Sequence, residues 1–505
     1  MFLTVSLCLL AFVLYFVLVA KAPKSGDPPN PGWYPLVGSL PFLREPLEEF
    51  LSEKQFAKQP VVVLYMGLEK LYCLNTYEAI KDAFISQGDK FLGRQQTFIL
   101  PELTGEKAGI ILSEDEQWRL YRRLSLKTLR DFGFGRQGAE EIILGEVEEL
   151  RSRIEDQGIQ AGLPLDTVPL LSTAVSNVIC QMVFGTRLAS EDPEFGRVLE
   201  MFQRITQSQN NRTRSMVFQL HQDYYVKLKP LLRLVIALRR KQINIFGELI
   251  KFCRKQLEKH KADLGSPEHP RDYIEAFLHQ QASNPSEFND VRLSLAVLDL
   301  FIAGTDTTSQ TLRWAILFLI ENPEVEKRLV DEIKRVVGSD RQVTMKDKSQ
   351  LHYTQAVIDE VNRMACLAQL GVAHRCTETA KVCGYEIPKD ALVLFNIFNV
   401  HNSVDHFPQP ECFQPERHLD QEGRYSPDEH LVTFGIGKRA CLGESLARME
   451  LFLFLANLVQ RFTFRLDPEE TRTIAEIKAN PGHQGGGIRA PAVHKIQFNS
   501  RCEEE

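Results

Sequence analysis

Apolar residues recur along most of the chain at the three-to-four-residue spacing of an amphipathic helix. The spacing predicts helices over residues 119–130, 139–156, 171–184, 292–321 and 442–464, with one or two more between 226 and 261. Residues 292–321 are apolar almost all round, so this helix should cross the middle of the fold, and Asn322-Pro323 should end it. Short alternating segments at 67–75 and 377–400 predict small sheets. The pattern therefore predicts a mainly α protein with small β-sheets.

The chain has 505 residues, with 60 basic and 66 acidic side chains and a formal net charge of −6. This balance excludes a strongly basic nucleic-acid-binding protein. With 44% apolar and 25% charged residues, the composition is that of a globular protein. No shift in composition divides residues 39–505, which are predicted to form one domain. None of the ten cysteines lies in a CxxC pair, which argues against a zinc ribbon and favours reduced thiols.

The first twenty residues carry no charged side chain and would span about 30 Å as a helix, enough to cross a bilayer. Lys21 and Lys24 follow and favour a cytoplasmic location for the rest of the chain. We therefore expect a transmembrane signal anchor at 1–20. A cleaved signal peptide is the alternative, but a basic start is missing and the apolar run is long. The proline-rich segment 21–38 predicts a stiff, extended hinge.

The segment with the most specific chemistry is 434–443, with the sequence FGIGKRACLG. Cys441 comes just before a predicted helix, whose dipole favours a thiolate. The flanking glycines let the backbone approach a flat ligand, and backbone N–H groups in such a turn can donate to the sulfur. Arg439 lies two residues away and can meet an anion. A lone cysteine is usually an inert buried thiol, so it is the pattern FxxGxRxCxG that favours a ligand.

This pattern resembles the haem-binding loop of the cytochrome P-450 superfamily, the haem-thiolate monooxygenases. The resemblance runs from the proline-rich hinge to about residue 465 and is strongest to the microsomal family-2 type, at 118–133 and 437–454. It implies the cytochrome P-450 fold, with a single catalytic domain over 39–505. It also implies haem b as cofactor, with Cys441 as the axial iron ligand. A thiolate ligand pushes electron density onto iron and favours O–O bond cleavage.

A second motif, 303–308 with the sequence AGTDTT, lies midway along the predicted central helix. Glycine, β-branched residues and an acid are poor choices for a helix interior, and threonine hydroxyls bond back to the i−4 carbonyl. Alone, such a segment is more often a helix kink; a local opening there would make room for dioxygen and water. The resemblance identifies the segment as an oxygen-activation motif. It implies that Thr307 hydrogen-bonds dioxygen and that Asp306 helps to relay protons, as the catalytic pair.

Glu360 and Arg363 lie three residues apart on one predicted helix face, a commonplace surface pair on their own. The resemblance joins them to Arg417 in a structural Glu-Arg-Arg network that locks the cysteine loop. Haem also carries two propionates, which need cationic or hydrogen-bonding partners. Five residues match the propionate contacts of the superfamily: Arg94, Trp118, Arg122, His374 and Arg439.

Four basic residues, Arg119, Arg123, Lys127 and Arg130, follow one face of the helix predicted near residue 118. Such a stripe is either a solvated helix face or a docking site for an acidic electron donor. The resemblance implies NADPH–cytochrome reductase as this donor, with cytochrome b5 as a second candidate partner. No GxGxxG motif follows a predicted strand, so the sequence predicts no nicotinamide site of its own.

Four positions match residues that face substrate in the superfamily: Phe98, Ala303, Thr307 and Val372. They suggest an apolar ligand, although most pockets are apolar. The chain departs from the usual pattern in segment 366–374, which lacks prolines, and in the tail 471–498. It also has Phe407 where tryptophan is common and His418 where phenylalanine is common. Substrate specificity is therefore not transferred from the resemblance.

The resemblance, together with the apolar N-terminal segment, implies a monooxygenase of the endoplasmic reticulum membrane, single-pass and with a cytoplasmic catalytic domain. It would act on a small lipophilic molecule such as a fatty acid, a steroid or a foreign compound, and not on nucleic acid. Three alternatives remain open: a haem-thiolate isomerase or dehydratase that needs no reductase, a haem-binding sensor or carrier, and a secreted disulfide-bonded protein. In the last case the sequon Asn211-Arg212-Thr213 would be glycosylated.

Overall fold

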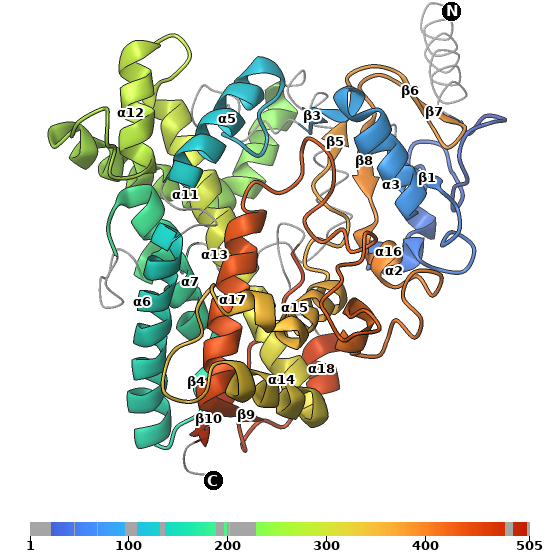
Figure 1. The fold of residues 1–505 in the computed structure, drawn as a ribbon. Coiled ribbons are helices and arrows are strands. Elements are labelled where there is room, and N and C mark those ends of the chain that lie inside the picture. The colour runs from blue at the N-terminus through green and yellow to red at the C-terminus, as the bar shows by residue number, and fades with distance from the viewer. Residues whose placement is uncertain are drawn as a thin grey trace, which may run out of the picture.

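The computed structural model describes residues 22–501, apart from 45, 68, 96–108, 132–136, 188–195, 199–200, 202–228 and 480–487. The predicted anchor at 1–20, the substrate-facing candidate Phe98 and the sequon at Asn211 lie outside the described residues. The described part is mainly helical with small sheets, which confirms the fold class predicted from the sequence (Figure 1).

Nine long helices form the body of the molecule: α5 (Asp115–Asp131), α6 (Gln137–Arg153), α7 (Thr167–Phe184), α11 (Lys229–Ala262), α12 (Tyr273–Ser283), α13 (Asp290–Glu321), α14 (Pro323–Val336), α15 (His352–Ala365) and α17 (Glu444–Arg461), as counted among the described residues. Short helices are α2 (Leu47–Leu51), α3 (Tyr77–Lys81), α16 (Ile397–His401) and α18 (Ile474–Ala479). Short helices of the 3₁₀ and π types are η1 (Leu40–Phe42), η2 (Asp82–Ser86), η3 (Gly88–Phe91), η4 (Ile154–Gln160), η5 (Lys348–Gln350) and η6 (Pro415–His418).

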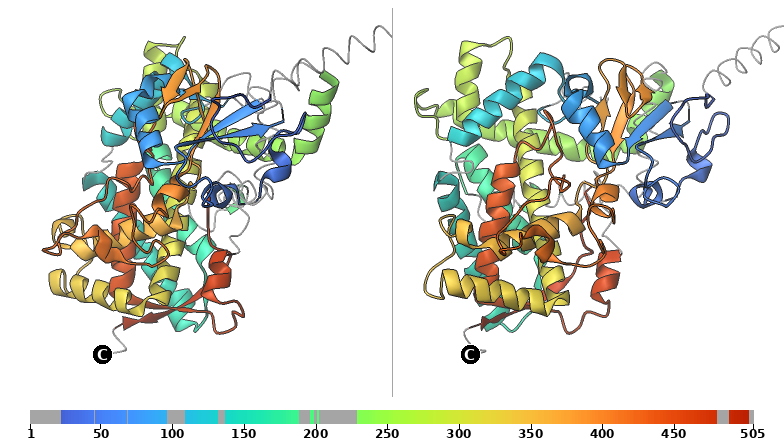
Figure 2. Two further views of the ribbon diagram at one scale, coloured as in Figure 1. Left: turned by 90° about the vertical axis from the view of Figure 1, so that its right-hand side faces the viewer. Right: turned by 45° about the vertical axis from the view of Figure 1, so that its right-hand side comes forward.

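Three small sheets accompany the helices. The five-stranded sheet has the order β1 (Val61–Met66), β2 (Glu69–Leu74), β8 (Leu392–Phe395), β5 (His374–Arg375), β3 (Gly93–Arg94), and only the β2–β8 pair is parallel. The second sheet has the order β4 (Leu165–Asp166), β10 (Lys495–Ser500), β9 (Phe462–Leu466). A hairpin pairs β6 (Ala380–Val382) with β7 (Tyr385–Ile387). Figure 2 shows the five-stranded sheet beside the upper part of the helical body, and β9 and β10 at the lower end of the helical body.

Helix α13 runs through the centre of the helical body and packs against α7, α11, α15 and α17 (Figure 1). It starts where the Asn289 side chain accepts a hydrogen bond from the Arg292 N–H, and Pro323 follows its end and starts α14. Trp314 on α13 is among the largest fully buried side chains of the core. The prediction of a central apolar helix ended by Asn322-Pro323 is therefore confirmed.

The proline-rich segment differs from the extended hinge expected from its sequence. The Pro29 carbonyl accepts a hydrogen bond from Val63 on β1, and residues 34 and 38 bridge each other across a tight turn. Gly38 has φ +63°, and a Cβ there would lie 2.0 Å from the Tyr65 carbonyl oxygen. The segment turns back because it docks on β1, whose backbone groups compete with the extended conformation that the prolines favour.

Among the described residues, one helix is long and apolar enough to span a membrane, α7. Its apolar window is 83% buried, and the helix packs against α6 and α13. Burial of this kind is that of a core helix, because a membrane-spanning helix would present its apolar side chains to lipid. All described cysteines are free thiols, five of the eight being buried, as expected for reduced thiols.

Candidate functional site

The cysteine loop is shaped by two glycines in the left-handed region, Gly435 at φ +69° and Gly437 at φ +81°. A Cβ at Gly437 would lie 2.2 Å from the carbonyl oxygen of Phe84, so no other residue fits there without moving the backbone. The Cys441 N–H donates to the carbonyl of Phe434 at 2.9 Å, which closes the loop. Helix α17 begins three residues later, so the cysteine precedes a helix as predicted.

The Cys441 side chain is accessible on its open side, while protein atoms surround the rest of the sulfur. This burial raises the pKa of the Cys441 thiol, and the backbone N–H groups of Gly443 and Glu444 and the charge of Arg122 oppose the rise. The sequence predicted that backbone N–H groups of this turn would donate to the sulfur, and such bonds tune a sulfur ligand. A metal cation on the accessible side would favour the thiolate, because coordination removes the thiol proton. The surroundings of Cys441 therefore suit a metal ligand.

The structure brings the five predicted propionate contacts together. Arg94 on β3 is paired with His374 on β5 in the antiparallel register. Trp118 and Arg122 lie one turn apart on α5, and the Arg122 guanidinium carbon is 5.9 Å from the centre of the indole. The guanidinium carbon of Arg439 lies 4.0 Å from the centre of the same indole. The Arg122 guanidinium also donates to the Ala440 carbonyl at 2.8 Å, beside Cys441.

Electrostatics shows that this arginine cluster, Arg94, Arg122 and Arg439, suits an anion. Burial and the charge of Arg122 lower the pKa of Arg94 to about 10. Burial and the charge of Arg94 lower the pKa of Arg439 to about 9. Burial, with the charge of Arg94 next, lowers the pKa of His374 well below its usual value. Like charges that are desolvated together are relieved by an anion, so the donor set fits the two carboxylates of haem.

The predicted oxygen-activation motif lies on α13, with the Ala303 side chain exposed and Thr307 partly exposed. The Thr307 hydroxyl donates to the Ala303 carbonyl at 2.8 Å, the back-bond that the sequence predicts. A Cβ at Gly304 would lie 3.0 Å from the Ile179 side chain, so the glycine allows α7 to pack closely. The expected opening of the helix is not seen, since α13 is continuously helical here. The hydroxyl of Thr307 adds a side-chain hydrogen bond to α13, and the backbone hydrogen bonds of the helix remain in place.

Two carboxyl groups near this motif were not singled out by the sequence analysis. Glu450 on α17 is fully buried and accepts a hydrogen bond from Thr308 at 3.0 Å, and burial raises its pKa to about 8. Asp299 lies one turn before Ala303 and accepts from the N–H groups of Ile110 and Ile111 at 2.6 and 2.9 Å. In both cases the sequence places an acid inside an apolar helical run, and this pattern could have indicated a buried carboxyl group.

Asp299 provides a prediction on pH. Burial raises its pKa to about 6, so its stabilising contribution is complete below the unfolded pKa near 4 and is lost as the pH rises through 6. We expect the unfolding free energy of Asp299→Asn to gain about 2–3 kcal/mol relative to the wild type between pH 4 and pH 7. Denaturant unfolding of both proteins across this range measures it. Parallel pH profiles would contradict a raised pKa of Asp299.

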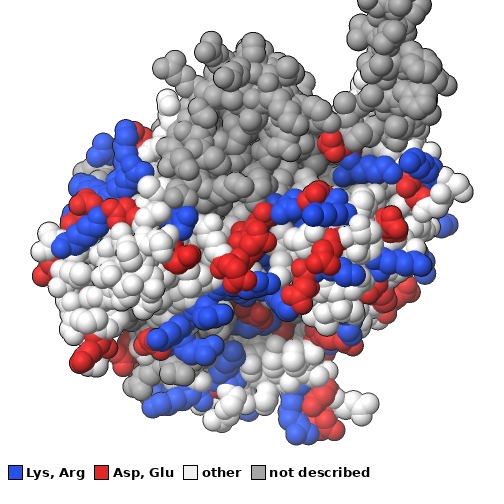
Figure 3. Space-filling model, turned by 90° about the horizontal axis from the view of Figure 1, so that it is seen from above, with Lys and Arg blue, Asp and Glu red and all other residues white. Residues whose placement is uncertain are grey.

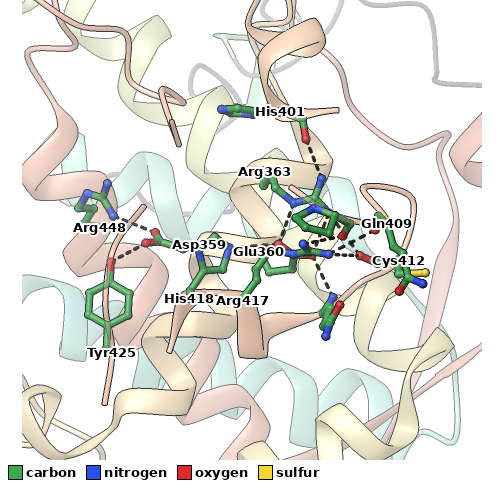
Figure 4. Close-up of polar contacts among 12 residues, drawn as sticks. Asp359, Glu360, Arg363, His401, Gln409, Cys412, Arg417, His418, Tyr425 and Arg448 are labelled. Carbon is green, nitrogen blue, oxygen red and sulfur yellow. Dashed lines mark hydrogen bonds and ion pairs between the residues drawn. The ribbon is translucent and has the colours of Figure 1, made fainter. Parts of the chain in front are cut away.

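The predicted Glu-Arg-Arg network is present and has a fourth member (Figure 4). The Glu360 carboxylate meets Arg363 through two bonds of 2.8 Å, Arg417 at 3.1 Å and His418 at 3.1 Å. Burial opposes ionisation of Glu360, but the bonds from Arg363 and His418 hold its pKa at about 2. The histidine that replaces the usual phenylalanine thus bonds to the network that the resemblance implied.

The network reaches the cysteine loop through His401. Arg363 donates to the His401 carbonyl at 2.8 Å, and the His401 ring nitrogen Nε2 accepts from the Val432 N–H at 3.1 Å. Val432 in turn accepts from the Gly435 N–H at 2.9 Å. Burial lowers the pKa of His401 to about 3, which keeps the ring neutral and able to accept this bond. The locking role predicted for the network therefore has a continuous hydrogen-bonded path.

The departure from the usual pattern after α15 does not displace His374. Cys366 ends the helix in the left-handed region at φ 39°, and Gly371 at φ 58° packs against the Phe395 ring. Arg489 from the tail donates to the carbonyls of residues 364 and 365, and its own N–H donates to the carbonyl of residue 367. The tail, which matches the superfamily poorly, thus stabilises the segment without prolines.

The basic stripe on α5 is exposed at all four predicted positions: Arg119, Arg123, Lys127 and Arg130. Arg119 pairs with Glu116 on the same helix. Figure 3, which looks down on the end of the molecule that carries α5, shows basic and acidic side chains interspersed over the described surface. The stripe is therefore a local feature and not part of a wide basic field.

Comparison with known proteins agrees with this site. The family model described as Cytochrome P450 matches residues 28–482. Cytochrome P450 2J5 of Mus musculus is 34% identical over 98% of this chain and 95% of its own length. Cytochrome P450 2B4 of Oryctolagus cuniculus is 34% identical over 98% of this chain and 99% of its own length. Cytochrome P450 2G1 of Rattus norvegicus is 35% identical over 91% of this chain and 92% of its own length.

The accessible thiol and the arginine cluster fit a haem-thiolate protein, the class to which these relatives belong. The chain belongs to the cytochrome P450 family and is of the family-2 type. It is a haem-thiolate monooxygenase, with haem bound through a cysteine thiolate as in other members. Its family-2 relatives support attachment to the endoplasmic reticulum membrane, a redox partner and a lipophilic substrate in general.

Proposed function

We propose that this protein inserts one atom of dioxygen into a C–H bond of a fatty acid, a steroid or a foreign lipophile. The second oxygen atom leaves as water, which takes up two protons and two electrons. NADPH–cytochrome reductase supplies the electrons from NADPH, with cytochrome b5 as an accessory donor. Haem, ligated by Cys441, supplies dioxygen binding and O–O bond cleavage. The observation that carries the proposal is the accessible Cys441 thiol beside the arginine cluster.

The arginine cluster, Trp118 and His374 hold the haem propionates in this proposal. The guanidiniums and the indole are donors whatever the state of the ligand. His374 differs, because its ring nitrogen Nδ1 lies 2.6 Å from the Phe91 carbonyl and therefore carries a hydrogen. In the neutral ring Nε2 is then an acceptor, so His374 donates to a propionate only as an imidazolium, which the propionate charge favours.

Asp306 and Thr307 hold and deliver the protons that dioxygen needs. Burial raises the pKa of Asp306, against the effects of its hydrogen bond to Gln310 and the charge of Arg313, so this acid retains a proton more readily than an exposed one. The Thr307 hydroxyl donates to Ala303, which leaves its oxygen as an acceptor towards the accessible face of α13. An isomerase or dehydratase has no need of this pair, because its reaction takes up no dioxygen.

The test of the proposed function is turnover of candidate lipophiles under ¹⁸O₂ with NADPH and reductase. One ¹⁸O atom in the product, absent when reductase is omitted, is the expected result. Product without reductase and without label would establish the isomerase or dehydratase alternative. Ligand binding without oxygen consumption would establish the sensor or carrier.

Thr307→Ala should lower product formation by about 10²-fold, because loss of a positioned proton-transfer group costs that much or more. Reducing equivalents should leave as hydrogen peroxide instead. Thr311→Ala is the matched control, since Thr311 makes the same back-bond at 3.0 Å, to the Thr307 carbonyl, one turn further along α13. Product and peroxide are measured per NADPH consumed. Equal yields from the two variants would contradict a special role for Thr307.

Charge reversal of the basic stripe should weaken reductase docking. Arg123→Glu with Lys127→Glu is expected to raise the KM for reductase about tenfold at low salt, since opposed charges steer association. Lys327→Glu with Arg335→Glu changes the same charge on exposed positions of α14, at the other end of the molecule (Figure 1). Reductase titrations of both double variants measure the effect. If the α14 control raised KM equally, net charge and not the stripe would be responsible.

We also propose the domain arrangement of an anchor at 1–20, a proline-rich connection at 21–38 that docks on β1 instead of forming an extended hinge, and a catalytic domain at 39–505. The anchor holds the protein once through the endoplasmic reticulum membrane with the domain in the cytoplasm. The expected result is a protein resistant to alkaline extraction, of unprocessed mass and without glycan at Asn211. A processed, glycosylated, soluble product would establish the secreted alternative.

A further inference from the structure

The acid of the catalytic pair lies at the start of a hydrogen-bonded chain along α13. Asp306, Gln310 and Arg313 follow one another at helical spacing on one side of this helix. The Gln310 amide nitrogen Nε2 donates to Asp306 Oδ1 at 2.9 Å. The Arg313 guanidinium nitrogen Nη1 donates to Gln310 Oε1 at 2.6 Å. Gln310 thus lies between the carboxyl group and the Arg313 cation.

Arg313 is fixed by the fold itself. Its Nε donates to the Thr167 hydroxyl at 3.2 Å at the start of α7, and its Nη2 donates to the carbonyls of Pro491 and Ala492 at 3.1 and 2.9 Å. The side chain is 2% exposed, so these bonds are shielded from water. Asp166 on β4 attracts Arg313, while burial and the charge of Arg313 lower the pKa of His494, next to β10, to about 4.

The chemistry of the three groups fixes the orientation of the Gln310 amide. An arginine has only donors, so Gln310 must present its oxygen to Arg313. The amide nitrogen is then the atom that faces Asp306, and it can donate but not accept. Gln310 therefore holds Oδ1 and cannot take a proton from the acid, whose other oxygen, Oδ2, is left to exchange protons.

We infer that Gln310 is a positioning residue for the catalytic acid: clamped by Arg313, it holds Asp306 Oδ1 and reserves Oδ2 for proton delivery. The inference rests on the proposed function, in which Asp306 relays protons. It also gives the C-terminal tail a role in the site, because the tail carbonyls at 491 and 492 hold Arg313. Arg313 acts here through an amide and does not form an ion pair with the acid.

The test compares Gln310→Leu and Gln310→Glu in the full-length, haem-loaded enzyme. Leucine removes both bonds of Gln310, whereas glutamate keeps an acceptor for Arg313 but offers Asp306 no donor. The first readout is the infrared C=O band of Asp306, recorded at a pH low enough to protonate the acid and identified by its absence in Asp306→Asn. The second is the ratio of product to hydrogen peroxide during turnover. Gln460→Leu is the matched control, because Gln460 is equally buried but donates to the carbonyls of Gly338 and Arg341.

We expect both Gln310 variants to shift the Asp306 band to higher frequency and to lower the product-to-peroxide ratio several-fold, and Gln460→Leu to do neither. A Gln310→Glu enzyme with the wild-type band and ratio would overturn the inference, since only the bond to Arg313 would then matter. So would an unchanged band in Gln310→Leu. The infrared band needs no turnover, which separates the two proposals. If Asp306→Asn kept the wild-type ratio, the proton relay would fail, while a shifted band would still show that Gln310 positions Asp306.

Discussion

Replacement of Cys441 by alanine should abolish the strongly red-shifted Soret band that reduced haem-thiolate proteins give with carbon monoxide. The sulfur is the accessible thiol at the start of α17, next to the arginine cluster, and an alanine there offers iron no ligand. We expect monooxygenase turnover to fall below detection, because thiolate ligation is what favours O–O bond cleavage. The difference spectrum of the purified, reduced protein measures the ligand, and turnover with reductase measures the activity.

Cys412→Ser and Cys383→Ser are the matched controls, since both thiols are exposed and neither lies at a helix start beside the arginine cluster. Both should keep the wild-type spectrum and turnover. Retention of the red-shifted band in Cys441→Ala would mean that another cysteine ligates the iron. A band typical of histidine-ligated haem in the wild type would favour the sensor or carrier instead.

The fold class follows from the sequence because helical periodicity is strong here. The apolar run of 292–321 and the break at Asn322-Pro323 identify the central helix to within two residues of α13. The hinge shows where local propensity fails. Its prolines favour an extended chain, but the turn at residues 34–38 depends on backbone groups of β1, and pairing with a strand some thirty residues further along leaves no local signal.

The candidate site was predictable where a motif carries its own chemistry. The cysteine loop has a fixed spacing of this kind. The Glu-Arg-Arg network came only from the family resemblance, and the structure brings its members together. Gln310 and Asp299 were missed because their importance depends on what they meet in three dimensions. Gln310 matters through Arg313 and the tail, and Asp299 through the N–H groups of residues 110 and 111. Sequence spacing does not show such partners, although an acid in an apolar helix is a usable signal.

Glu360→Gln should destabilise the protein by about 3–5 kcal/mol, because it leaves the buried charge of Arg363, and the partly buried charge of Arg417, without their carboxylate. Arg363 is 1% exposed and Glu360 is fully buried, so water cannot solvate the arginine charge once the carboxylate is lost. The loss should be greatest at neutral pH, since the pKa of Glu360 is held at about 2 and its contribution is present above the unfolded pKa near 4. Denaturant unfolding at pH 7 measures the difference.

Asp405→Asn supplies the contrast, because Asp405 pairs with Lys58 at 3.4 Å with both side chains largely exposed. An exposed pair of this kind contributes about 0–1 kcal/mol. The path through His401 to Gly435 adds a second expectation, that Glu360→Gln also lowers haem retention at the Cys441 loop whereas Asp405→Asn does not. Losses of equal size in the two variants would show that packing, and not the Glu360 charge, holds the cysteine loop in place.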